Sequence, residues 1–384
     1  MNGAFRPVCF TIEGLNSFAT VIYFNYLYFL FRDRFGFNDK ENLTLAALIG
    51  LIYMFASWQA GRFAQRAGNF TALKIGFGVM AAGLAAGSQL HSVAGEIAAA
   101  CVVNVGMCFI WPVLEALVRE GAHAARAVGI YNITWAAANA AAYFIGGTLI
   151  VKFGYQSMFY LPLGFVLVQL ALVFVLERIP GAVAGEPSEP LPHDPNRPAP
   201  ARAKNFQRMA WLANPFAYIA INTLLAVIPG LAAKFQMSPM LAGFVCSLWC
   251  FVRLGTFVVL WRWPGWHYRF RWLVTAFALL VLAFAAILIA PNLAVLIAAQ
   301  ACFGMAIGLI YYSSLFYSMD ASDTKSEHGG IHEAAIGAGN FIGPAVGAAA
   351  LQFASQSPNA GTYAVSGLLL CGLGGLVGIW KTGR

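Results

Sequence analysis

The sequence predicts an all-α integral membrane protein with twelve transmembrane helices in two pseudo-symmetric halves of six. Three observations lead to this fold class. Hydrophobic residues make up 60% of the 384-residue chain and charged residues only 10%, whereas an ordinary soluble domain is about 25% charged. Apolar stretches of about 20 residues, each long enough to cross a bilayer as a helix, recur along nearly the whole chain. One of these stretches is also repeated in the second half of the sequence.

The expected spans lie between clusters of charged and turn-forming residues. They are residues 8–31, 42–61, 70–90, 95–118, 127–151 and 156–177, followed by 209–232, 239–261, 272–290, 293–318, 330–354 and 361–380. The sequence lacks the strict alternation of polar and apolar residues that marks a barrel strand, so helices are the spanning elements. The first span has no small-residue cleavage site, and we therefore expect a helix of the protein rather than a removable signal peptide.

A segment rich in proline, charged and small residues interrupts the pattern between the sixth and seventh spans. This composition is typical of a linker. We expect residues 1–178 to form the N-terminal six-helix half, 179–207 a cytoplasmic linker, and 208–384 the C-terminal six-helix half. The segment GIYNITWAAANAAAYFIGG from Gly129 aligns without gaps to GIHEAAIGAGNFIGPAVGA from Gly330, which pairs the fifth span with the eleventh. Duplicated halves of this kind occur in transporters, whose solute site lies between them.

The basic residues of the loops fall mostly on one side of the expected bundle. With both termini in the cytoplasm, most Lys and Arg residues lie in cytoplasmic loops, as the positive-inside rule requires. The net charge of +8 is then explained by topology and anionic surface lipid, and it requires no nucleic acid partner. We expect a monomeric, multi-pass protein of the cell membrane, whose partners are the lipid bilayer, a small-molecule substrate and, in the coupled case, protons.

The loop between the second and third spans carries a known pattern. It reads GRFAQRAGN and resembles the signature loop of the major facilitator superfamily, a family of membrane transporters. Gly61, Arg66 and Gly68 match that signature, whereas its acidic and basic positions are Gln65 and Asn69 here. Together with the twelve spans, the central linker and the repeat, the resemblance covers essentially the whole chain and implies a transporter.

The end of the fourth span adds to this resemblance and indicates a gate. It reads WPVLEALVREG and is followed by Arg126, which is similar to the acidic helix end and following arginine of the superfamily. Arginines at a helix end can bind carboxylates or terminal carbonyls and so latch the two halves together. The alternatives are retention of positive charge in the cytoplasm and, for the acidic residue, a solvated salt bridge. The gating candidates are Gly61, Arg62, Arg66, Gly68, Glu115 and Arg126.

Polar side chains inside the spans predict a cavity, because such groups are costly in hydrocarbon unless they face the bundle interior. The third, sixth, ninth and twelfth spans carry no charge away from their ends, so we expect walls from the first, fourth, fifth, seventh, eighth, tenth and eleventh. Polar groups alternate there with aromatic rings, which suits a small organic solute. The substrate-binding candidates are Asn104, Trp111, Trp135, Asn139, Asn222, Arg253, Tyr311 and Asn340. For the asparagines, hydrogen bonds between helices are an equal alternative.

Arg253 lies near the middle of the eighth span, where its side chain cannot easily reach either interface, so it needs an anion. Glu13 or Glu333 would give an internal pair, and a substrate carboxylate or phosphate would give a binding site. Glu333, Glu13 and the adjacent His332 are also the proton-coupling candidates. A desolvated carboxyl group can exchange a proton near neutral pH. A buried, hydrogen-bonded glutamate without a coupling role is the alternative.

These features together favour a secondary active transporter that moves a small organic solute by alternating access, coupled to protons. An uncoupled facilitator and an efflux pump for amphipathic compounds are the alternatives. The chain has no G-x-x-x-x-G-K-[ST] loop for ATP and no H-E-x-x-H or G-x-S-x-G arrangement, so a membrane enzyme is disfavoured. Its seven cysteines lie in apolar segments, and we expect no disulfide, metal or cofactor.

Overall fold

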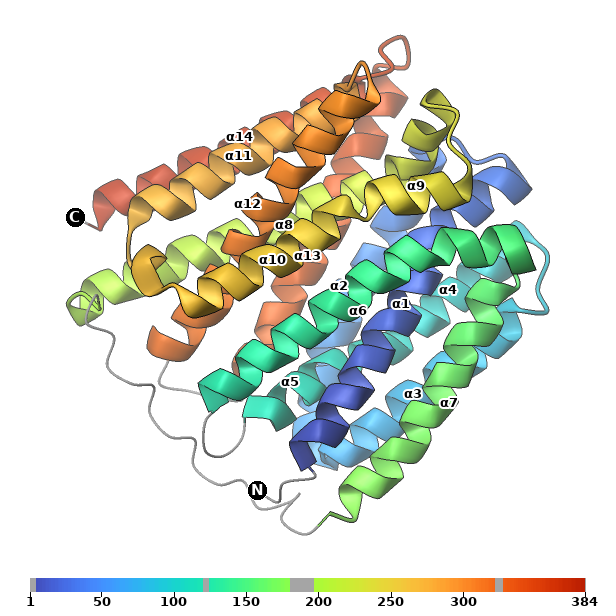
Figure 1. The fold of residues 1–384 in the computed structure, drawn as a ribbon, viewed down its shortest axis with the longest axis horizontal. Coiled ribbons are helices and arrows are strands. Elements are labelled where there is room, and N and C mark those ends of the chain that lie inside the picture. Colours follow the sequence, from blue (N-terminus) through green and yellow to red (C-terminus); the bar gives the residue numbers. More distant parts are fainter. Residues whose placement is uncertain (1–4, 120–123, 180–196, 322–326, 384) are drawn as a thin grey trace.

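The computed structural model describes residues 5–119, 124–179, 197–321 and 327–383, which form an almost entirely helical bundle (Figure 1). In this part of the chain, eleven helices are long and apolar enough to cross a membrane. The first helix is not among the eleven, although it has the length, because asparagine and tyrosine side chains interrupt its apolar run. The expected count of twelve spans is therefore matched by the eleven apolar helices together with this first helix, which is more polar than the others.

Six spans make up the half of the bundle that precedes the linker. Its helices are α1 (Phe5–Phe35), α2 (Asp39–Ala67), α3 (Asn69–Gly87), α4 (Val93–Cys108), α5 (Trp111–Arg119), α6 (Ala124–Phe153) and α7 (Ser157–Glu177). The expected fourth span is divided into α4 and α5, which are separated at Phe109 and Ile110. Each of the other expected spans in this half corresponds to one helix.

The second half repeats this arrangement. Its elements are α8 (Pro200–Lys234), α9 (Pro239–Cys246), α10 (Leu248–Arg262), the short 3₁₀ helix η1 (Pro264–Trp266), α11 (Phe270–Ile289), α12 (Leu293–Ala321), α13 (Glu327–Phe353) and α14 (Ala360–Thr382). The eighth span is divided between α9 and α10. The repeat detected in the sequence thus lies on α6 and α13, the fifth span of each half.

The turn between α2 and α3 shows why its glycine is needed. Gly68 ends α2 and begins α3 with φ of 91°, a conformation that L side chains rarely adopt. A Cβ atom at this position would meet nothing within 4 Å. Backbone conformation, rather than crowding, therefore requires glycine here.

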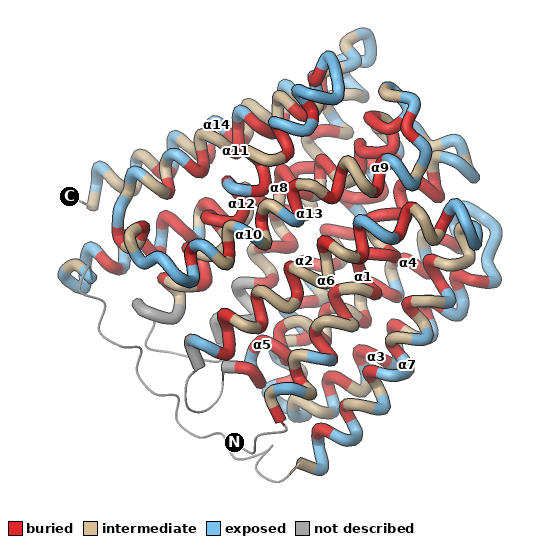
Figure 2. The backbone as a smooth tube through the Cα atoms, in the orientation of Figure 1, coloured by how far each residue is buried: buried red, intermediate tan, exposed pale blue. Residues whose placement is uncertain are grey.

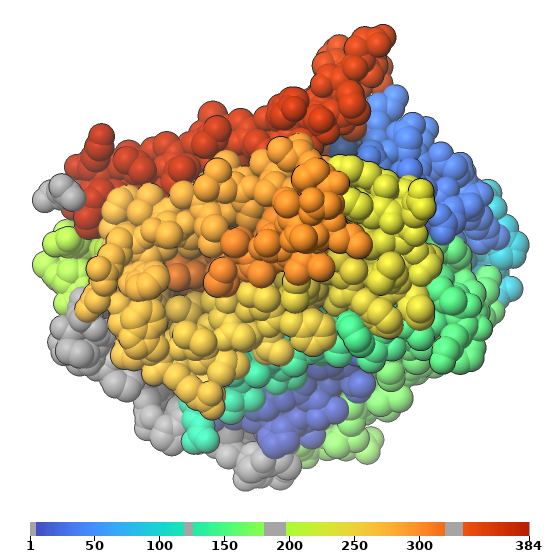
Figure 3. Space-filling view, turned by 45° about the horizontal axis from the view of Figure 1, so that its top comes forward, coloured from blue at the N-terminus to red at the C-terminus, as the bar shows by residue number. Residues whose placement is uncertain are grey.

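The two halves make backbone contact where their helices cross. α2 packs along α13, and α6 packs against α9 and α10. A Cβ added to Gly337 on α13 would lie 2.5 Å from Cα of Met54 on α2, and one added to Gly147 on α6 would overlap the carbonyl oxygen of Pro239. Small residues allow transmembrane helices to approach this closely. In the space-filling view, the yellow surface of α9 and α10 lies directly against the green surface of α6 (Figure 3).

Burial separates central helices from peripheral ones. α3 and α7 lie along one edge of the bundle and α11 and α14 along the other, with many exposed positions (Figure 2). These four are the third, sixth, ninth and twelfth spans, which the sequence analysis left out of the expected cavity walls. The remaining helices surround the centre, where the candidate site lies.

Candidate functional site

A cavity of about 210 Å³ lies between the two halves of the bundle. Within the described ranges, its lining comes from α1, α2, α4, α5, α6, α8, α10, α12 and α13, and not from α3, α7, α11 or α14. The sequence-based list of walls was wrong in one respect, because it omitted α2. That helix contributes Ile49, Gly50 and Tyr53. Its cavity face carries one tyrosine among apolar residues, so no polar periodicity marked it.

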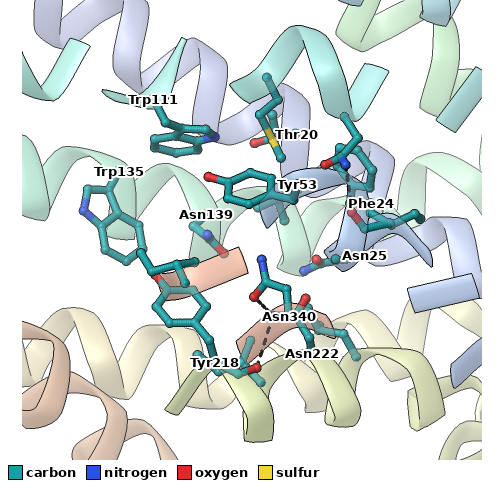
Figure 4. Close-up of a pocket in the computed structure, with 18 of the residues that line it drawn as sticks. Thr20, Phe24, Asn25, Tyr53, Trp111, Trp135, Asn139, Tyr218, Asn222 and Asn340 are labelled. Carbon is teal, nitrogen blue, oxygen red and sulfur yellow. Dashed lines mark hydrogen bonds between the residues drawn. The ribbon is translucent and has the colours of Figure 1, made fainter. Parts of the chain in front are cut away.

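The eight residues expected to bind substrate all line this cavity, and several are labelled in Figure 4. They come from six spans, of which the fourth is divided into α4 and α5: Asn104 from α4, Trp111 from α5, Trp135 and Asn139 from α6, Asn222 from α8, Arg253 from α10, Tyr311 from α12 and Asn340 from α13. Their convergence is a fact of the structure. Their role in binding stays a prediction.

Arg253 is held between two indole rings. Its guanidinium carbon lies 4.5 Å from the ring centroid of Trp135 and 4.9 Å from that of Trp249. The residue is 5% exposed, and its Nε and Nη2 atoms are buried without a hydrogen-bond partner among the described residues. The ion pairs of those residues include none between Arg253 and Glu13 or Glu333. Cation–π contact offsets part of the cost of this charge but gives Nε and Nη2 no acceptor among the described residues.

Trp135 is itself fixed by its neighbours. Its Nε1 donates to Oδ1 of Asn132 at 2.9 Å. Its ring meets Tyr311 and Phe257 edge to face, with centroids 5.3 and 5.6 Å apart. These contacts join α6 to α10 and α12, so the surface on which the guanidinium rests is built from both halves.

Glu333 is buried and joined to the opposite half. Tyr53 of α2 donates its hydroxyl hydrogen to Oε2 of Glu333 on α13 at 2.5 Å. Both residues line the cavity and are less than a tenth exposed. The sequence singled out Glu333 but missed Tyr53, since a lone tyrosine in an apolar span is common and gives no periodic signal.

Glu13 lies behind the cavity wall rather than in it. It is fully buried, its Oε1 accepts a hydrogen bond from Ser17 at 2.9 Å, and its Oε2 has no hydrogen-bond partner in the described chain. On this helix Thr20 lines the cavity, whereas Glu13 and Asn16 do not. The side chain of His332 lies outside the described residues.

The gating candidates are divided between the helix ends and the cavity. Gly61, Arg62 and Arg66 belong to the last turns of α2, which Gly68 closes, and the guanidinium of Arg62 lies 5.0 Å from the ring of Trp58. Arg126 is exposed near the start of α6. Glu115, by contrast, is 7% exposed and lines the cavity. Its position is therefore deeper than a solvated salt bridge requires, and the gate stays a prediction.

The asparagines join helices and also line the cavity, whereas their role in binding stays a prediction. Asn104 donates to the carbonyl oxygen of Ile49 on α2 at 2.9 Å, and Asn222 donates to Oδ1 of Asn340 at 2.6 Å. Both bonds join helices, and all of these amides also line the cavity. Lining residues that the sequence analysis missed include Asn25, Tyr131, Tyr218 and Trp249. Trp249 had a usable signal, since it precedes Arg253 by one helical turn.

The described part of the chain contains neither a cluster of side chains suited to a metal ion nor a disulfide bond. No group of three or more His, Cys, Asp or Glu residues is placed to hold a metal ion there. The cysteines are free, and four of them are buried. Cys250 donates to Oδ1 of Asn139 at 3.8 Å.

Comparison with known proteins identifies the class. The chain matches the sequence profile of the Major Facilitator Superfamily over residues 9–344. It therefore belongs to the Major Facilitator Superfamily, and it is a multi-pass membrane transporter of a small molecule rather than an enzyme. A search of the curated proteins gives no match.

Solved structures share this fold at low sequence identity. The human organic anion transporter MFSD10 (TETRAN) is 14% identical with a TM-score of 0.70, over 97% of this chain and 98% of that one. An auto-inhibited POT family peptide transporter is 14% identical with a TM-score of 0.77, over 98% and 96%. A bacterial homolog of the human lysosomal transporter Spinster is 13% identical with a TM-score of 0.64, over 100% and 96%. These similarities establish the fold and leave the substrate open.

Proposed function

We propose that this protein is a secondary active transporter that moves a small organic anion across the membrane by alternating access, coupled to protons. The observation that carries the proposal is Arg253, a guanidinium buried in the central cavity with two donor atoms unpartnered in the described chain. A cation at such a position is costly unless it has an anionic partner or a task. A substrate carboxylate or phosphate would supply that partner.

The lining indicates what else the substrate carries. Trp135 and Trp249 flank the guanidinium, Tyr311 packs against Trp135, and further tyrosines and isoleucines complete the wall. Aromatic walls with few polar groups bind flat or apolar bodies and orient them through those polar groups. A small organic anion with an apolar body can contact both the guanidinium and the aromatic wall, whereas an inorganic anion would contact the guanidinium and leave most of the wall without a partner.

The proton-coupling part of the proposal rests on Glu333. As a carboxylate it is a strong acceptor for the Tyr53 hydroxyl group, and as a neutral acid it is a weaker one. Uptake of a proton therefore loosens a contact between the halves. Entry of one anion together with one proton also leaves the net charge of the cavity unchanged. Glu13, buried behind the wall, is the second coupling candidate.

The remaining features of the proposal concern topology. We place both termini in the cytoplasm of a cell-membrane protein that works as a monomer, with residues 1–178 and 208–384 as the halves that move. Exposed arginines support this orientation, because they lie at the ends of even-numbered spans or the starts of odd-numbered ones, which share one side of a bundle whose successive spans alternate in direction: Arg62, Arg66, Arg126, Arg202, Arg262, Arg269 and Arg271. Among proteins of this fold, one solved structure is an organic anion transporter.

Flux measurements test the proposed function. Purified protein in proteoliposomes is given labelled organic anions or neutral solutes of matched size, with and without an imposed pH gradient. We expect the gradient to drive accumulation of anions, and a protonophore to abolish it. Equilibration without accumulation would indicate an uncoupled facilitator, and flux of neutral solutes alone would contradict the role of Arg253.

A further inference from the structure

Four uncharged carboxamides converge on one part of the cavity. Asn25 of α1, Asn139 of α6, Asn222 of α8 and Asn340 of α13 all line it, and Figure 4 shows them close to one another. We call these four residues the carboxamide ring. Each half contributes one amide from its first span and one from its fifth. Asn139 and Asn340 are also aligned residues of the sequence repeat.

The ring retains hydrogen-bonding capacity toward the cavity. Asn222 uses its Nδ2 to donate to Oδ1 of Asn340 at 2.6 Å and to the carbonyl oxygen of Tyr218 at 3.2 Å. Its own Oδ1 and the Nδ2 of Asn340 stay available. Asn25 is 6% exposed and makes no hydrogen bond with its side chain to any described residue. The ring therefore offers donors and acceptors together. An amide without a partner is costly in the membrane interior, so helix association alone does not account for all four.

Asn139, one member of the ring, lies about one helical turn along the backbone from the level of the guanidinium. Trp135, which contacts Arg253, precedes Asn139 by four residues on α6, a rise of about 6 Å. On α10, Cys250 contacts Asn139 and precedes Arg253 by three residues, a rise of about 4.5 Å. Along both helices the backbone rise between Asn139 and the level of the guanidinium is thus close to the length of one benzene ring.

We propose that the substrate is an aromatic carboxylate that carries an amide-like group, with both a donor and an acceptor, on the side of the ring opposite the carboxylate. This inference rests on the proposed function, since Arg253 binds the carboxylate. The carboxamide ring then pairs with the amide-like group, as one amide pairs with another. A site with polar groups built for a partner rejects analogues that lack it, because its own groups are left unpaired.

Three probes separate the two ends of the site. Purified full-length protein is titrated with 4-acetamidobenzoate, with 4-tert-butylbenzoate, which lacks the amide, and with methyl 4-acetamidobenzoate, which lacks the charge. Apparent affinities come from the rise in melting temperature with probe concentration. We expect 4-acetamidobenzoate to bind at least about tenfold more tightly than either of the others.

Variants assign each preference to its residues. Asn340→Ala and Asn25→Ala should reduce the preference for the amide-bearing carboxylate over 4-tert-butylbenzoate to within about threefold. Arg253→Gln should weaken both carboxylates by about tenfold or more. Asn359→Ala is the matched control, because this residue caps α14 outside the cavity with no side-chain capping bond, and it should change no affinity.

The outcomes distinguish this inference from the proposed function. Equal binding of the two carboxylates, unchanged in both asparagine variants, overturns the role of the carboxamide ring and leaves the organic anion in place. Binding of the methyl ester as tight as that of the acid, unaffected by Arg253→Gln, overturns the anionic substrate itself. Absence of any thermal shift with all three probes, while the wild type still accumulates other anions, also overturns the inference.

Discussion

Tyr53 on α2 donates a hydrogen bond to Glu333 on α13 over 2.5 Å, and so a single hydroxyl group joins the two halves beside the central cavity. Glu333 aligns with Asn132 in the sequence repeat. One member of a duplicated pair of helices therefore carries an ionisable group where the other carries an amide. The hydrogen bond from Tyr53 to Glu333 can therefore respond to protonation, whereas a bond to Asn132, which does not titrate, cannot.

The first prediction concerns this carboxyl group. Glu333→Gln keeps the shape of the side chain but removes its titration, so transport should lose its dependence on the pH gradient while exchange of substrate across the membrane continues. Counterflow and gradient-driven uptake in the same proteoliposomes measure the two activities. Gradient-driven accumulation at the wild-type level in this variant would show that Glu333 does not couple protons.

The second prediction concerns its partner. Tyr53→Phe removes the donated hydrogen bond and should lower the free energy of unfolding by about 1 kcal/mol, the usual net value of such a bond. Combined with Glu333→Gln, the two losses should be less than additive, because both substitutions alter the same contact. Thermal unfolding of the four proteins in a double-mutant cycle gives the coupling. Fully additive losses would indicate that the two side chains do not interact in the dominant state.

The third prediction concerns Arg253. Replacing buried ion pairs by apolar side chains of similar volume is often neutral or stabilises a protein by about 1–4 kcal/mol, and the same desolvation argument applies to Arg253, whose Nε and Nη2 have no hydrogen-bond partner among the described residues. Arg253→Met should therefore raise the melting temperature of the ligand-free protein and abolish stabilisation by organic anions. A lower melting temperature without ligand would mean that the guanidinium has an internal anionic partner after all.

The fold was predictable because the bilayer requires a minimum length and hydropathy of each span. The boundary between the halves was predictable because the segment between α7 and α8 differs from the spans in composition, being rich in proline and charged residues. α1 departs from this pattern, since its asparagines and tyrosines lower its hydropathy, and of these Asn25 and Tyr28 line the cavity. The cavity residues were predictable where a polar group is costly in lipid, as at Arg253 and Asn139. Tyr53 was not, because tyrosine is tolerated in many membrane environments and only the tertiary structure brings it to Glu333. The contact between α2 and α13 likewise depends on helix crossing, which local sequence does not specify.

The fourth prediction concerns the gate. Glu115 is buried in the cavity wall on α5, near the end of the fourth span. The proposed topology puts that end on the cytoplasmic side, so Glu115→Gln should change the accessibility of the cavity from that side and slow transport. Labelling of a cysteine introduced into the wall, with an impermeant reagent, reports this accessibility. Unchanged labelling and unchanged flux together would remove Glu115 from the gating mechanism.

The fifth prediction concerns the crossing of α2 and α13. A methyl group at Gly337 would lie 2.5 Å from Cα and 2.7 Å from the backbone nitrogen of Met54, so the two backbones would have to separate. Overpacking of this kind costs about 1–3 kcal/mol, and Gly337→Ala should lower the melting temperature and slow transport. Gly78→Ala on α3 is the matched control, since its added methyl group would meet nothing within 4 Å. In Gly78→Ala the only expected effect is the higher helix propensity of alanine, worth up to about 1 kcal/mol. The melting temperature of this variant should therefore equal or exceed that of the wild type. Equal melting temperatures for both variants would show that α2 and α13 are not in backbone contact in the membrane, and the Tyr53–Glu333 contact between them would then lack its support.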